Sequence, residues 1–149
     1  MLIFVDTQVT NSGYNKLYLS AIRDNINFYH ICFCEYENNG YIVKYINGYL
    51  SENKFNLKTS SYLSEPSTCM YPELIKNNSK LLLSWVNYNK LFTCTSTNDG
   101  LTWSKPNIDE YSLEDNFIRS TFYSNYKDDL EYNISHVFST LNDVGILGL

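Results

Sequence analysis

Short apolar runs alternate with polar turns along the whole chain. Lys16–Ile22 alternates between apolar and polar residues, and Ile26–Tyr36 is a longer strand-like run. A period of two is typical of a β-strand that buries one face. The other runs that predict strands are Met1–Val5, Tyr41–Leu50, Glu73–Ile75, Lys80–Val86, Leu91–Thr95, Phe117–Tyr123, Tyr132–Phe138 and Gly145–Leu149.

Turn signals separate these runs. Asn39-Gly40, Asn47-Gly48 and Asn98-Asp99-Gly100 are dipeptides or tripeptides of the kind that join antiparallel strands in hairpins. The Ser-rich segment Leu50–Ser64 fits either an outer strand or a loop, and no stretch repeats with a helical period. Regularly spaced strands with such turns predict an all-β fold, as an antiparallel sandwich, barrel or propeller.

An internal sequence repeat narrows the choice among these all-β folds. Lys16–Ser20 resembles Lys80–Ser84, and Cys34–Gly40 resembles Cys94–Gly100, at a spacing of about 60 residues. Repeats of about this length built from antiparallel strands are typical of propeller blades, the alternative being two accidental hairpins in an Asn-rich chain. We therefore expect one unit over residues 1–149, with a first repeat at about 1–64, a second at about 65–125 and a partial third at 126–149.

Composition and charge limit the function. The 11 basic residues are scattered singly and the net charge is −5, so the chain lacks the basic stripe that nucleic acids or anionic membranes require. The sequence has no segment of transmembrane length, and we expect its first residues not to act as a signal peptide. We expect cytoplasmic synthesis without a signal peptide, and release, if any, within a virion or an extracellular particle after lysis.

The four cysteines show no metal-binding spacing. They do not form a CxxC pair and have no zinc-like spacing with either histidine, so we expect buried free thiols and neither a metal site nor another cofactor. The cysteines are Cys32, Cys34, Cys69 and Cys94, and the histidines are His30 and His136.

The segment Ser96–Trp103 resembles the Asp box of the sialidase (neuraminidase) superfamily, whose pattern is Ser-x-Asp-x-Gly-x-Thr-Trp. Asn98 stands where Asp is usual, and Asp99 follows it. The resemblance implies partial β-propeller architecture of two to three blades, and a structural role for the box at a blade turn. The residues that we assign to this structural box are Ser96, Asn98, Asp99, Gly100, Thr102 and Trp103.

Sialidase activity is not expected. Sialidases resemble one another in using three arginines, a tyrosine nucleophile paired with a glutamate, and an aspartate acid/base, and this chain contains only Arg23 and Arg119. Bidentate recognition of a carboxylate needs Arg, and scattered Lys does not replace it. We therefore expect no catalytic residues and no enzyme activity.

The sequence thus predicts a non-catalytic propeller-like module that recognises glycans or cell surfaces, or that serves in structural assembly, as in a phage or phage-tail-like particle. Arg119, Tyr123 and Trp85 are the expected ligand contacts. Because two or three blades leave sheet edges and apolar faces open, we expect a homo-oligomer or docking on a larger protein assembly. The alternative is a glycoside hydrolase of exo-sialidase type whose active site is completed by another chain.

Overall fold

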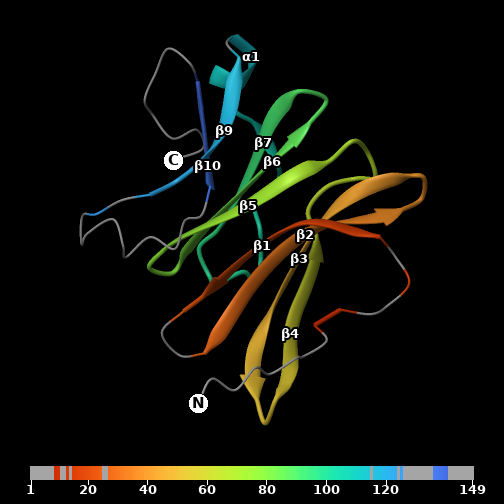
Figure 1. Ribbon diagram of the computed structural model, residues 1–149, viewed down its shortest axis with the longest axis vertical. Coiled ribbons are helices and arrows are strands. Elements are labelled where there is room, and N and C mark those ends of the chain that lie inside the picture. The colour runs from red at the N-terminus through yellow and green to blue at the C-terminus, as the bar shows by residue number, and fades with distance from the viewer. Residues whose placement is uncertain are drawn as a thin grey trace.

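Two four-stranded antiparallel sheets and a two-stranded sheet make up the computed structural model, which describes residues 9–10, 13, 15–24, 27–114, 116–123, 125 and 136–140 (Figure 1). The first sheet has the order β1 (Lys16–Arg23), β2 (Phe28–Glu37), β3 (Gly40–Ser51) and β4 (Lys54–Tyr62). The second has the order β5 (Met70–Asn77), β6 (Lys80–Asn87), β7 (Lys90–Ser96) and β8 (Asn107–Ile108). After one turn of helix, α1 (Tyr111–Glu114), β9 (Phe117–Thr121) pairs with β10 (His136–Thr140). The predicted all-β antiparallel class is confirmed.

The first and second sheets pack against each other through β1, β2 and β5. On β2, alternate residues point to opposite faces. Cys32 and Cys34 belong to the core shared with the second sheet, while Ile31 and Phe33 belong to a separate cluster. The shared core contains Ile22, Cys32, Cys34, Val43, Tyr45, Leu63, Cys69, Leu74, Leu81, Leu83, Trp85 and Cys94.

The β9–β10 pair covers part of the second sheet's other face. Phe138 is buried against Val86 and Leu91, and Phe117 meets Phe138 edge-on at a ring-centroid distance of 6.0 Å. The three sheets therefore follow one another in space in chain order, as Figure 1 shows from the orange strands through green to blue.

A bulge recurs at the same place in the two larger sheets. The pairing register shifts between Leu17 and Ser20 in β1 and between Met70 and Glu73 in β5. At these bulges Tyr18 and Tyr71 adopt φ values of 57° and 51°, in the left-handed region that non-glycine residues seldom occupy. The bulges bring the two rings together with a centroid distance of 4.4 Å.

One of the predicted turns is wrong, and one open alternative is resolved. Asn47-Gly48 is no turn, because β3 runs through it with a shift of pairing register. A Cβ at Gly48 would lie 2.2 Å from the Asn56 carbonyl oxygen, so this glycine permits close approach of β4. The Ser-rich segment Leu50–Ser64 is largely the outer strand β4, the first of the two options.

The two similar sequence segments do not occupy equivalent strands of the two large sheets. Lys16–Ser20 lies in the first strand of its sheet and Lys80–Ser84 in the second strand of the other. Likewise, Asn38-Asn39-Gly40 joins the second and third strands, whereas Asn98–Gly100 follows the third strand, so the two turns are not equivalent. The strands expected at Met1–Val5 and Gly145–Leu149, and the start of the one at Tyr132–Phe138, lie outside the described residues.

Within the described ranges, no helix is long and apolar enough to cross a membrane.

Candidate functional site

The segment Ser96–Trp103, which we call the Asp-box segment after its sequence pattern alone, is a closed local hydrogen-bond network. The Ser96 hydroxyl accepts a hydrogen bond from the Gly100 amide at 2.9 Å and donates to Asn98 Oδ1 at 3.0 Å. The same Oδ1 accepts the Thr102 amide at 3.0 Å, while Asn98 Nδ2 donates to Thr102 Oγ1 at 2.9 Å. An Asx side chain that binds the amides of its own turn is a known way to fix loop geometry. Asn98 therefore holds this turn together through both atoms of its amide group.

This segment also joins the two large sheets. Trp103 meets the Tyr45 ring of β3 edge-on, with centroids 4.8 Å apart. Asn47, also on β3, donates from Nδ2 to the Asp99 carbonyl at 3.0 Å. Gly100 has φ +80° and lies so close to Tyr45 that a Cβ would be 2.0 Å from the hydroxyl oxygen. The box thus determines the contact between sheets as well as its own turn.

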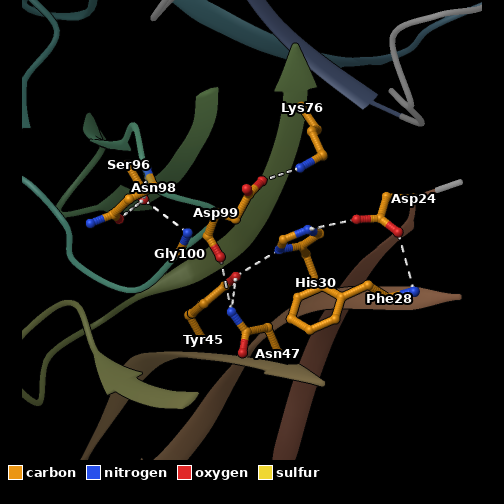
Figure 2. Close-up of polar contacts among 10 residues, drawn as sticks. All are labelled: Asp24, Phe28, His30, Tyr45, Asn47, Lys76, Ser96, Asn98, Asp99 and Gly100. Carbon is orange, nitrogen blue, oxygen red and sulfur yellow. Dashed lines mark hydrogen bonds and ion pairs between the residues drawn. The ribbon is translucent and has the colours of Figure 1, made fainter. Parts of the chain in front are cut away.

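His30 belongs to a group of polar residues that connects the two large sheets (Figure 2). We name this group the inter-sheet polar cluster; its members are His30, Tyr45, Asn47 and Asp99. The Tyr45 hydroxyl lies 2.7 Å from His30 Nδ1 and accepts a hydrogen bond from Asn47 Nδ2 at 3.1 Å. The hydroxyl has one proton and a second lone pair, so it can pair with either tautomer of His30. His30 is completely buried, and none of the described residues accepts a hydrogen bond from Nε2.

The surroundings keep His30 neutral. Burial lowers the pKa of His30 from 6.5 to about 4, and the positive charge of Lys76 acts in the same direction. Asp24, whose Oδ2 lies 3.9 Å from Nε2, opposes this shift only partly. Lys76 itself forms an ion pair with Asp99 at 2.5 Å. The cluster is closed to substrates, so we interpret it as a structural joint.

A second polar group lies where the second sheet meets β9. Arg119 on β9 donates from both Nε and Nη2 to Glu73 Oε1 on β5, with the Nε contact at 3.0 Å. Glu73 is only 4% exposed, and His136 Nδ1 on β10 lies 3.6 Å from the same oxygen. Two charge-assisted bonds to one carboxylate hold the guanidinium in a fixed orientation.

The outer side of this group is aromatic. The Arg119 guanidinium carbon lies 5.3 Å from the centroid of the Tyr71 ring, a cation–π distance, and Tyr71 in turn contacts Tyr18. Tyr18 and Tyr71 are 38% and 36% exposed, and the Arg119 side chain is 32% exposed. We name Tyr18, Tyr71 and Arg119 the Tyr–Arg ledge.

A cavity of about 610 Å³ opens beside this ledge. Its wall combines apolar side chains with amide, hydroxyl and guanidinium groups, and both kinds of surface are exposed in it. The lining residues among those described are Met70, Tyr71, Val86, Asn89, Ser112, Leu113, Asn116, Phe117, Arg119 and Phe138.

The structure does not bring the three expected ligand contacts together. Arg119 lines the cavity beside the ledge. Trp85 is 1% exposed and stacks on Phe92 in the core between the first two sheets. Tyr123 is 84% exposed and lies outside this cavity lining. The sequence did not single out Tyr18, Tyr71 and Glu73.

The cysteines and the described groups that could bind a metal are further candidates for chemistry. All four thiols are free and buried, as expected, and burial raises the pKa of Cys34 and of Cys94 to about 12. Nowhere in the described part of the chain do three or more His, Cys, Asp or Glu side chains gather in a way that could hold a metal ion.

Comparison of the chain with protein-family models, with curated protein sequences and with solved structures found no match.

Proposed function

We propose that this chain is a non-catalytic glycan-binding module and that the Tyr–Arg ledge with its adjoining cavity holds the sugar. The observation that carries this proposal is the pairing of Tyr18 and Tyr71, at matching bulges, beneath a guanidinium that Glu73 holds in place. An exposed aromatic face suits the apolar face of a pyranose, while a fixed guanidinium and nearby amides suit its hydroxyl groups.

We also propose that the two four-stranded sheets are propeller blades. Each is a simple meander in which every strand pairs with the next in sequence, and each carries the same bulge in its first strand. The Asp-box-like loop after β7 packs on the preceding sheet, which agrees with a repeated contact between blades. Closure of a ring would then require further copies of the chain or a larger assembly.

Binding is favoured over hydrolysis by the composition of the cavity. Glycosidases that use two carboxyl groups hold them about 5–9.5 Å apart across the scissile bond. Among the described lining residues there is no Asp or Glu, and the neighbouring Glu73 already accepts both bonds from Arg119. A hydrolase completed by a second chain would have to receive its carboxylates from that chain.

A glycan array probed with fluorescently labelled protein tests the proposal. Tyr71→Ala should abolish array binding without changing the urea midpoint of unfolding by much, since the side chain is partly exposed. Tyr123→Ala is the matched control, because it removes an equally large, exposed ring away from the cavity. Equal loss in both variants, or binding that survives Tyr71→Ala, would contradict the assignment. Turnover of a fluorogenic sialoside would instead favour the hydrolase.

The assembly and its setting need separate tests. Light scattering coupled to gel filtration should give a mass above that of one chain, and a clean compact monomer would contradict ring closure by self-association. A role in a phage or phage-tail-like particle predicts tail or baseplate genes beside the gene for this chain.

A further inference from the structure

We infer that the Tyr–Arg ledge is built for neutral saccharides, and that Glu73 sets this preference by neutralising Arg119. This inference rests on the proposed glycan-binding function and adds the charge class of the ligand. It differs from what the sialidase resemblance implies, because sialidases recognise an acidic sugar through its carboxylate.

The first step is the charge at the site. Arg119 is the one charged side chain among the described residues that line the cavity. Its Nε and Nη2 donors both engage Glu73, so one full edge of the guanidinium is occupied by a protein carboxylate. Because the two side chains bear opposite charges in an ion pair, they offer little attraction to a distant anion.

The second step is burial. Glu73 is 4% exposed, and its carboxylate therefore lies in surroundings where water screens charge poorly. A ligand carboxylate on the free edge of Arg119 would face this negative charge across a single guanidinium. Like charges placed so close oppose binding, whereas sugar hydroxyl groups meet no such penalty.

The third step is the remaining wall of the cavity. Met70, Val86, Phe117 and Phe138 supply apolar surface, and they are accompanied by the side chains of Asn89, Ser112 and Asn116. This mixture matches a ligand that has apolar C–H faces and neutral hydroxyl groups. Glu73 is thus a positioning residue, which acts on the ligand through Arg119.

The experiment measures the binding of two matched pairs of glycans to wild-type protein and to Glu73→Gln. In the first pair the oligosaccharide ends in neutral galactose or in acidic galacturonic acid. The second pair is neutral lactose and acidic 3′-sialyllactose. Wild-type protein should bind the neutral galactose-ended member about tenfold or more tightly than its acidic partner. Glu73→Gln keeps the size and one acceptor oxygen but frees the positive charge, so it should gain about tenfold or more for the acidic member. Glu37→Gln removes the same charge outside this cavity and should leave the ratio unchanged.

A second measurement uses wild-type protein alone, in case Glu73→Gln does not fold. The affinity for the neutral glycan should change less than about twofold between low and high salt, because an uncharged ligand makes no charge–charge interaction that salt could screen. Tighter binding of the acidic members by wild-type protein, or a ratio that Glu73→Gln does not alter, overturns this inference while leaving glycan binding intact. Failure of wild-type protein to bind any glycan overturns the proposed function and this inference together.

Discussion

Acidification should weaken this fold through His30 in particular. Burial places its pKa at about 4 in the folded chain against 6.5 in the unfolded chain. Between these two values the unfolded chain binds a proton that the folded chain does not. The stabilisation that neutral His30 provides is therefore fully present above about pH 7 and is lost as the pH falls through 6.5 toward 4.

The size of the effect follows from the same two values. At about 1.4 kcal/mol for each pH unit, the full difference corresponds to about 3.5 kcal/mol, of which about 2 kcal/mol is lost between pH 7.5 and pH 5. Domains of this size are typically stable by only about 5–15 kcal/mol, so the loss is easily measured. The structural reason is that protonation would bury a charge on the imidazole, which Asp24 and Asp99 compensate only partly.

Urea unfolding of wild-type protein and His30→Asn, followed by tryptophan fluorescence at pH 7.5 and pH 5, is the appropriate assay. Asn places Oδ1 near the position of the imidazole Nδ1, so it keeps an acceptor for Tyr45 and removes the titration. Wild-type protein should lose about 2 kcal/mol more than the variant over this interval. His136→Asn removes the other histidine, whose side chain is 31% exposed, and should retain the loss that belongs to His30.

An equal loss in wild-type protein and His30→Asn would refute the reasoning, because carboxylates elsewhere would then account for the acid sensitivity. A gain in wild-type stability at pH 5 would refute it more directly, since it would mean that the folded chain protonates His30 readily.

Three further results are expected from the Asp-box segment and the thiols. Gly100→Ala should destabilise the fold by about 2–4 kcal/mol in urea titrations, because its Cβ would collide with Tyr45 and its φ is positive; a change under about 0.5 kcal/mol would contradict the close approach. Asn98→Asp introduces the residue of the Asp-box pattern and keeps the Oδ1 acceptor, so its unfolding free energy should stay within about 1 kcal/mol of wild type, and a larger loss would mean that the Nδ2 bond to Thr102 dominates. All four thiols should resist a disulfide reagent in native protein and react at once in urea, since they are buried, and any fast native thiol would place a cysteine at the surface.

The fold class could be predicted because both of its signals are local. Alternating apolar residues and Asn-rich turns depend on neighbours in sequence, and Asn38 and Asn39 indeed hold the positive φ values of a tight turn. The position of each strand within its sheet could not be predicted in this way. Lys16–Ser20 and Lys80–Ser84 look alike as strands, yet long-range packing makes one a first strand and the other a second.

The polar groups that matter for the site were harder to find. Glu73 and His30 each interrupt an apolar run, and an ionisable residue inside such a run is the signal that the sequence offered. Their partners, Arg119 and Tyr45, lie 46 and 15 residues away in the chain, so no spacing rule connects them. The ledge depended on bulges at Tyr18 and Tyr71, where neither residue is a glycine that would mark an unusual backbone.

The Asp-box segment connects the two large sheets in addition to fixing its own turn. Its internal hydrogen bonds hold Gly100 and Trp103 against the Tyr45 ring of β3. They also orient the Asp99 carbonyl so that it accepts a hydrogen bond from Asn47. The backbone of Asp99 makes the contact between sheets, while its half-exposed carboxylate is occupied by Lys76. That division explains why a motif on a turn can stabilise a whole pair of sheets, and it argues against a catalytic role for Asp99.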